Sequence, residues 1–161
     1  MTTPEGPGSA ALSQDFRDLL VELRGAGAEF LVVGAHALAA HGVSRATGDL
    51  DVLVRSDEEN SRRVYLALGR FGAPLGAHGV RADDFARPSV VYQVGLPPTR
   101  IDVLTSISGV SFEAAWPNRV TRSIDGVELD FLGLEDLKAN KLASGRTKDL
   151  LDLELLREAG L

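Results

Sequence analysis

The chain has 161 residues, of which 44% are hydrophobic and 25% charged, and its formal net charge is −6. These totals predict one globular domain with a substantial core. They argue against a non-specific nucleic-acid binder, which would carry a basic surface. The absence of cysteine excludes disulfides, thiolate metal sites and a cysteine nucleophile, and it is compatible with a cytoplasmic protein. No apolar run approaches the roughly 20 residues that a membrane span needs.

The N-terminal segment, residues 1–12, is rich in proline, glycine and serine. It has neither the basic region nor the apolar region of a signal peptide. We therefore expect a mobile tail at 1–12, followed by a single folded domain over 13–161.

The first part of the domain combines helical and strand periodicity. Ser13 is a suitable N-cap for a helix with apolar residues at i, i+3, i+4 and i+7, which Gly25 or Gly27 would end. The segment "EFLVVG" predicts a buried strand, and "AHALAAHG" predicts a short helix. After a loop, "DLDVLVR" predicts a second strand, and "DEENSRRVYLALGRFG" predicts a helix with acidic residues in its first turn.

The second part predicts two hairpins and two helices. Residues 73–88 are glycine-rich and suggest a loop with room for one short strand. Two strands joined through Leu96-Pro97-Pro98 and two joined through Asp125-Gly126 predict hairpins, with a short helix between them at "SFEAAW". The C-terminal segment predicts two helices broken near Ser144-Gly145, the second capped by Thr147 or Ser144. The order of elements predicts an α+β fold, a mixed sheet with packed helices.

Two aspartates interrupt the second strand. Asp49 and Asp51 are two residues apart, so they project from the same face of the strand, about 6.6–7 Å apart, whereas Leu50, Val52 and Val54 point to the core. Aspartate is a poor strand former, and paired carboxylates suit a hard divalent cation such as Mg²⁺. The alternative is an edge strand whose charges prevent aggregation.

The segment before these aspartates favours the metal site. A buried strand ends at Gly34, and a helix begins immediately after it. The first N–H groups of a helix suit phosphate binding, and Gly34 allows a close backbone approach. Phosphates would then lie between this helix start and the two aspartates.

The stretch "VVGAHALAAHGVSRATGDLDVLV" resembles the DNA polymerase β-like nucleotidyltransferase superfamily. Members of this superfamily have an apolar strand, a glycine followed by Gly or Ser, and then D-x-D or D-x-E in a hydrophobic strand. The segment "GVSRATGDLDVLV" is similar to the small bacterial branch of AbiEii-type toxins and related uncharacterised domains. The resemblance spans about residues 30 to 157.

The resemblance implies a third carboxylate on an adjacent strand. Asp102 in "TRIDVLTSI" fits this position, where the family residue helps to deprotonate the attacking hydroxyl. Asp102 has an ordinary alternative role as a charge partner of Arg100. Asp130 in "VELDFLGL" is a competitor, but we prefer Asp102 because "IDVL" repeats the hydrophobic context of "LDVL".

The C-terminal helices are similar to a family motif in which Lys, Arg and Asp recur. All three lysines of the chain, Lys138, Lys141 and Lys148, lie within this region. By resemblance, Lys141 would contact nucleotide phosphates. Asp149 and Asp152 lie on one helical face, where they serve the site or tie the helix to Arg146 or Arg45. For Asp152 we prefer a structural salt bridge.

The chain departs from the family after Gly34, because Ala35 replaces the usual Gly or Ser. The backbone N–H of Ala35 remains available. His36 offers a side-chain donor, although a histidine in this position is more often packed in the core. Arg45 and Thr47, just before the aspartates, are better placed to hold a nucleotide or an acceptor.

The resemblance implies an enzyme that binds a nucleoside triphosphate with one or two Mg²⁺ ions. It would transfer the nucleoside monophosphate to an acceptor hydroxyl, on RNA such as tRNA, a protein or a small molecule. The toxin branch also suggests an antitoxin partner. The alternative is a non-catalytic nucleotide- or partner-binding module, antitoxin-like or sensory, which Ala35 and the short chain motivate. The sequence indicates no membrane partner and leaves the base preference and the oligomeric state open.

Overall fold

The computed structural model describes residues 12–161. The predicted tail therefore lies outside the described residues, apart from its last residue, Leu12. The Leu12 N–H donates to Asp125 Oδ2 at 2.9 Å.

The described chain follows the predicted order of helices and strands. The helices are α1 (Gln14–Gly25), α2 (Gly34–Ala40), α3 (Glu58–Phe71), α4 (Phe112–Ala115), α5 (Leu134–Ser144) and α6 (Thr147–Glu158). The strands are β1 (Phe30–Val33), β2 (Asp49–Val54), β3 (Val91–Val94), β4 (Arg100–Leu104), β5 (Val120–Ile124) and β6 (Val127–Phe131). Two short 3₁₀ turns, Asp84–Ala86 and Trp116–Asn118, complete the description.

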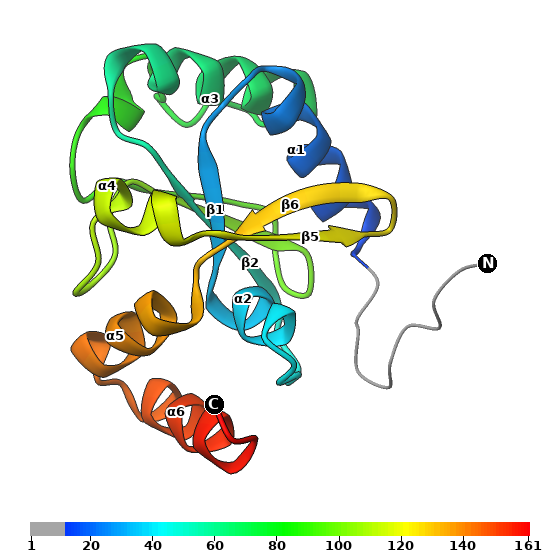
Figure 1. The fold of residues 1–161 in the computed structure, drawn as a ribbon. Helices are drawn as coiled ribbons and strands as arrows, with labels where there is room; N and C mark the ends of the chain where they lie inside the picture. The colour runs from blue at the N-terminus through cyan, green and yellow to red at the C-terminus, as the bar shows by residue number, and fades with distance from the viewer. Residues whose placement is uncertain (1–11) are drawn as a thin grey trace.

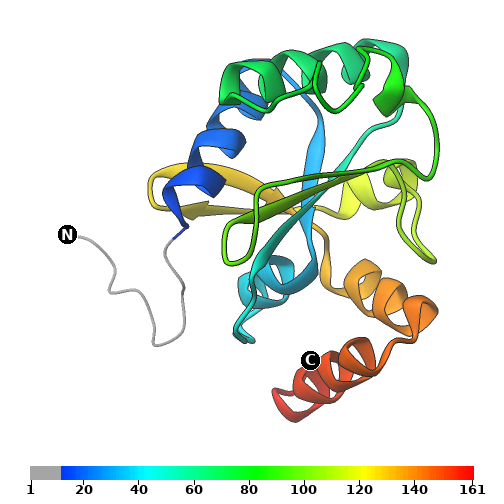
Figure 2. The same cartoon turned by 180° about the vertical axis from the view of Figure 1, so that it is seen from behind.

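The strands form one mixed sheet in the order β3-β4-β2-β1-β6-β5. The pairs β2–β4 and β1–β6 are parallel, and the pairs β1–β2, β3–β4 and β5–β6 are antiparallel. Figure 1 shows α1 and α3 above the sheet and α2, α5 and α6 below it, and Figure 2 shows the same separation from behind. The predicted α+β fold with a mixed sheet and two C-terminal helices is confirmed.

The local signals explain most elements. Ser13 Oγ accepts the Phe16 N–H at 3.2 Å and so caps α1 as predicted, and the apolar residues of that helix are buried. Asp125 and Gly126 both adopt positive φ, 50° and 78°, which the tight turn of a two-residue hairpin requires. The β3–β4 hairpin also forms as predicted.

One local prediction is confirmed in part and another is wrong. Residues 73–88 form the predicted loop, but the short strand for which it had room does not form. The loop contains one 3₁₀ turn, where Phe85 is buried, and Ser61 Oγ donates to Ala82 O at 2.8 Å. The N-cap of α6 is Arg146 rather than Thr147 or Ser144, and no side chain caps the helix. Ser144 Oγ instead accepts from Arg146 Nε at 3.1 Å.

The strand register brings the predicted site together. Val33, the last residue of β1, is opposite Asp51, and Asp51 is opposite Asp102 on β4. The end of β1, the start of α2 and the acidic residues of β2 and β4 therefore meet at one place. Among the helices of residues 12–161, none combines the length and apolarity that crossing a bilayer requires.

Candidate nucleotide-binding site

Three carboxylates converge beside the end of β1. One oxygen from each of Asp49, Asp51 and Asp102 lies within 4.8 Å of the others. Asp102 is buried, and its Oδ1 accepts no hydrogen bond in the described structure, although Arg100 Nε lies 3.4 Å away. A buried carboxylate oxygen without a hydrogen bond is costly, and a cation or a proton bound in this acidic cluster would offset that cost.

The ionised form of Asp51 is disfavoured by its surroundings. Burial and the negative charges of Asp102 and Asp49 raise the pKa of Asp51 from an ordinary 3.8 to about 6. The positive charge of Lys148 acts in the opposite direction. Like charges and desolvation both disfavour the ionised form, and a bound cation would relieve both effects.

Gly34 is required where α2 begins. Its φ is +67°, a conformation that L side chains rarely adopt. A Cβ atom at this position would also lie only 2.5 Å from Asp51 Oδ2. Gly34 therefore leaves space for the Asp51 carboxylate beside the backbone of the helix start.

A cavity of about 310 Å³ opens beside these residues. Its lining comes from the end of β1, the start of α2, the strands β2 and β4, the β4–α4 loop, α5 and the turn after α5. That loop can approach α5 closely because Gly109 has no side chain, since a Cβ there would lie 2.5 Å from the Cβ of Ala143. The cavity lining is Val33, Gly34, Asp51, Leu104, Ile107, Ser108, Asn140, Ser144 and Arg146.

Arg100 balances part of the acidic charge. Its Nη2 donates to Asp49 Oδ2 at 2.7 Å, and its Nε lies 3.4 Å from Asp102 Oδ1. Arg100 is the register partner of Asp49, so its side chain lies on the face that carries the carboxylates. Three carboxylates and one guanidinium leave net negative charge at the site.

Asp130 lies outside this arrangement. It sits on β6, which β1 separates from β2. Its carboxylate accepts from Thr121 Oγ1 at 2.6 Å and lies 3.6 Å from Arg119 Nε. Of the two candidates for the third acid, Asp102 is thus the one that joins Asp49 and Asp51.

A second group of charged residues, the ion chain, links the loop before β2 to the C-terminal helices. Its members, in order of contact, are Arg45, Asp152, Lys141, Asp149 and Arg146. Asp152 accepts from Arg45 Nε at 2.7 Å and from Arg45 Nη2 at 3.0 Å, and it lies 2.8 Å from Lys141 Nζ. Asp149 lies 3.6 Å from Lys141 Nζ and accepts from Arg146 Nε at 2.8 Å.

The carboxylates of the ion chain are held ionised. Burial alone would raise the pKa of Asp152, but hydrogen bonds from Arg45 and Lys141 outweigh it and hold that pKa below its usual range. Burial of Asp149 is likewise outweighed by hydrogen bonds from Arg146 and Ser144, which lower its pKa. The salt bridge preferred for Asp152 is present, with Arg45, and Asp149 pairs with Arg146, one of the alternatives that the sequence leaves open.

The structure gives Lys141 a local role different from the predicted one. Its side chain is only 4% exposed, and its ammonium group is shared by two carboxylates. A contact between Lys141 and nucleotide phosphates stays a prediction, and in this conformation the charge of Lys141 serves the packing of α5 against α6.

The other predicted nucleotide-binding residues differ in their contacts and burial. Arg45 is bound to Asp152, and Thr47 Oγ1 accepts the Asp49 N–H at 3.2 Å. Ala35 is buried in α2. His36 packs edge to face on Phe16, and burial lowers the pKa of its imidazole, so it is neutral at pH 7. Their contacts with a nucleotide stay predictions.

Sequence reasoning missed part of the cavity. Asn140 lines it from α5, Arg146 from the turn after α5 and Ser108 from the β4–α4 loop, and only the fold brings these segments to β2. The sequence does indicate that Arg100 pairs with Asp102, because the two lie two residues apart on a strand and share its face.

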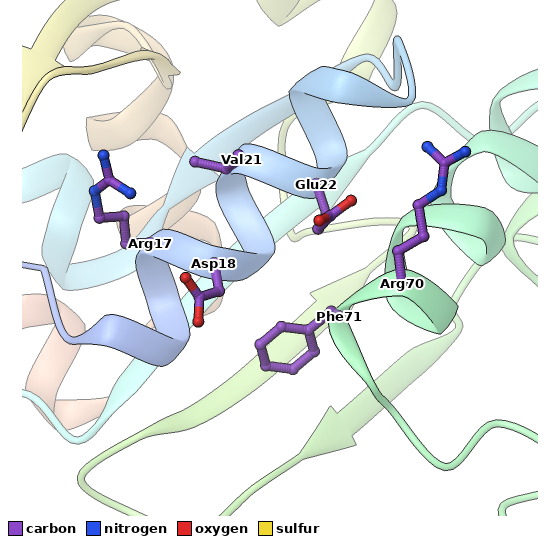
Figure 3. A pocket seen from close by; sticks show the side chains of 6 residues that line it. All are labelled: Arg17, Asp18, Val21, Glu22, Arg70 and Phe71. Carbon is purple, nitrogen blue, oxygen red and sulfur yellow. The ribbon is translucent and has the colours of Figure 1, made fainter.

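A second cavity of about 220 Å³ lies between α1 and α3 (Figure 3). Its lining is Arg17, Asp18, Val21, Glu22, Arg70 and Phe71. Figure 3 shows that the charged side chains point in different directions and do not converge on one point. None of the predicted site residues lines this cavity, and we assign it no function.

The comparisons with known proteins agree with this geometry. Residues 11–157 match the family described as "Nucleotidyltransferase of unknown function (DUF6036)". The fold is similar to the crystal structure of a "putative nucleotidyltransferase (TM1012)" from Thermotoga maritima, with a TM-score of 0.55, 15% sequence identity and 88% of each chain covered. At this identity the likeness concerns the fold alone, and no curated protein matches the chain. The family match covers nearly the whole domain, and the chain therefore belongs to this family of nucleotidyltransferases of unknown function.

Proposed function

We propose that the protein is a Mg²⁺-dependent nucleotidyltransferase that transfers a nucleoside monophosphate from a nucleoside triphosphate to an acceptor hydroxyl. The observation that carries the proposal is the convergence of Asp49, Asp51 and Asp102 beside a cavity large enough for part of a nucleotide. Family membership supports the reaction class.

The three carboxylates fit a divalent cation. Their oxygens are hard donors within 4.8 Å of one another, and Asp102 Oδ1 accepts no hydrogen bond among the described residues. The raised pKa of Asp51 reflects burial and the negative charges of its neighbours. Asp49, Asp51 and Asp102 would hold the ion. When bound, Mg²⁺ supplies charge neutralisation for the triphosphate and lowers the pKa of the acceptor hydroxyl.

The residues of the chain position the reactants and accept the proton. Asp102 Oδ1, which accepts no hydrogen bond in the described structure, would take the proton of the acceptor hydroxyl. The hydroxyl oxygen forms a bond to the α-phosphorus, and the bond from that phosphorus to pyrophosphate breaks. Gly34 allows the triphosphate to approach the backbone at the start of α2. Positioning and electrostatics account for most of the rate in this chemistry.

The acceptor class determines the biological role. The resemblance to the toxin branch favours RNA, and proteins or small molecules with a free hydroxyl are the other classes. A screen with α-labelled nucleoside triphosphates against total RNA, protein and small-molecule acceptors separates these classes by which fraction becomes labelled.

Substitution of the carboxylates tests the proposal. We expect Asp51→Asn and Asp102→Asn to reduce Mg²⁺-dependent label transfer about a thousandfold, with unchanged circular dichroism. Asp130→Asn is the matched control, because it removes a carboxylate from the same sheet outside the acidic cluster, and it should retain activity. Equal transfer by wild type and Asp51→Asn would refute the proposal.

Arg100 favours a second candidate function, a non-catalytic nucleotide-binding module. Its guanidinium already engages Asp49 and lies close to Asp102, so a cation of the chain itself partly balances the acidic charge. Calorimetry with ATP or GTP and Mg²⁺ distinguishes the two functions, because binding without turnover of labelled nucleotide on any acceptor class supports the second one.

A further inference from the structure

The lining of the cavity contains both an acidic and a cationic side chain. Asp51 lines the cavity from β2, and Arg146 lines it from the turn between α5 and α6. Arg146 is the only cationic residue in the described lining. An anionic ligand that enters beside the carboxylates therefore meets this guanidinium.

Asp149 orients the guanidinium of Arg146 but does not occupy all of its N–H donors. Asp149 accepts from its Nε at 2.8 Å and from its Nη2 at 3.4 Å. The side chain nevertheless remains 63% exposed. A guanidinium has five N–H donors in a fixed plane, so donors remain for a ligand while Asp149 fixes the plane.

The ion chain places its excess positive charge at this residue. It contains three cations, Arg45, Lys141 and Arg146, and two carboxylates, so it carries one net positive charge. Lys141 is buried between both carboxylates, and Arg45 makes two hydrogen bonds to Asp152. Arg146 is the most exposed of the three cations and the only one that lines the cavity.

We propose that Arg146 binds the β- and γ-phosphates of the nucleotide, and hence the departing pyrophosphate, and that the ion chain holds it in place. This inference rests on the proposed function for the identity of the ligand. A guanidinium binds two phosphate oxygens at once and so gives both charge and orientation. In this arrangement Lys141 is a positioning residue that acts through Asp149, and Arg146 contacts the ligand.

The first test measures binding without catalysis. The probe is inorganic tripolyphosphate with Mg²⁺, titrated into the full chain by calorimetry. We expect Arg146→Gln to weaken binding about ten- to hundredfold, as for the loss of a charged hydrogen bond. Arg157→Gln is the matched control, because Arg157 is also exposed on α6 and pairs with an acid three residues away, Glu154. The control should bind as wild type does.

The second test separates ligand contact from a structural role. Arg146→Gln should keep the unfolding temperature within a few degrees of wild type and raise the KM for the nucleoside triphosphate more than it lowers kcat. Arg146→Lys keeps the charge but not the planar geometry, and we expect it to recover only part of the affinity. A large loss of stability with unchanged tripolyphosphate affinity would overturn the inference.

The two proposals fail in different ways. If tripolyphosphate binds in an Arg146-dependent manner but no nucleotide is transferred, the anion site stands and the proposed function is wrong. If nucleotides are transferred with the same KM by wild type and Arg146→Gln, the function stands and the role of Arg146 is wrong. If wild type neither binds tripolyphosphate nor transfers nucleotides, both are overturned.

Discussion

Two groups of aspartates in this protein have the same chemistry and opposite electrostatics. In the acidic cluster, burial and like charges raise the pKa of Asp51 to about 6. In the ion chain, hydrogen bonds from cations lower the pKa of Asp149 and Asp152. Both groups are substantially buried, so the difference comes from their partners.

The number of ion pairs distinguishes a site from a scaffold. Among the described residues, Arg100 alone makes ion pairs in the acidic cluster, with Asp49 and Asp102, and Lys148 acts on Asp51 without an ion pair. Three cations make ion pairs with the two carboxylates of the ion chain. Uncompensated buried charge is tolerated where a ligand supplies the missing charge. Fully paired buried charge instead joins structural elements, here α5, α6 and the loop that leads to Asp49.

The largest effect on stability should come from breaking the ion chain. We expect Lys141→Met to lower the free energy of unfolding by about 3–5 kcal/mol, because it leaves buried carboxylates short of a cation. Chemical denaturation measures this change. Lys138→Met is the control, since Lys138 is more exposed and pairs only with Glu135, and its effect should stay below about 1 kcal/mol. Equal effects of the two variants would contradict the comparison.

The pH dependence of stability should differ between the two groups. Because the pKa of Asp51 is raised to about 6 in the folded state, folding takes up a proton between pH 4 and 6. With a chelator present to remove metal ions, the free energy of unfolding should therefore rise by about 2–3 kcal/mol as the pH falls from 7 to 4. The pKa values of Asp149 and Asp152 are lowered, so their contribution is full above about pH 4 and is lost at more acidic pH.

Denaturation at a series of pH values checks both signs. Asp51→Asn should remove the gain between pH 7 and 4 and leave the acid loss in place. At pH 7, Mg²⁺ should stabilise wild type and not Asp51→Asn. If the free energy of unfolding of the metal-free wild type does not change between pH 7 and 4, the pKa of Asp51 is not raised by burial and its neighbours.

The smallest expected effect concerns the backbone beside Asp51. Gly34→Ala and Gly27→Ala should introduce similar backbone strain from positive φ, about 1–2 kcal/mol, because the two glycines have φ values of +67° and +73°. A Cβ contacts Asp51 only at Gly34, whereas nothing lies within 4 Å at Gly27. We expect Gly34→Ala alone to weaken Mn²⁺ binding, measured by electron paramagnetic resonance. Equal Mn²⁺ affinities in the two variants would contradict this role for Gly34.

Local signals predicted the elements well and their electrostatic state poorly. Features that depend on a few neighbouring residues can be predicted from the sequence. Examples are the cap at Ser13, the turn at Asp125-Gly126 and the alternation in β2. The cap of α6 was mispredicted because Ser144 bonds Arg146 instead of the helix. No local pattern shows that Asp149 and Asp152 enclose Lys141, and the phosphate contact that the family resemblance implies for Lys141 stays a prediction.

The amino-acid sequence alone determined the order of elements, the position of Asp49, Asp51 and Asp102 on strands, and the glycine at the start of α2. Periodicity, caps and turn residues depend on neighbours along the chain, which is why these features were predictable. Only the tertiary structure decided which carboxylates are neutralised and which cation lines the cavity. Those properties depend on strand register and on contacts such as Arg45–Asp152, which join residues more than 100 positions apart in the sequence.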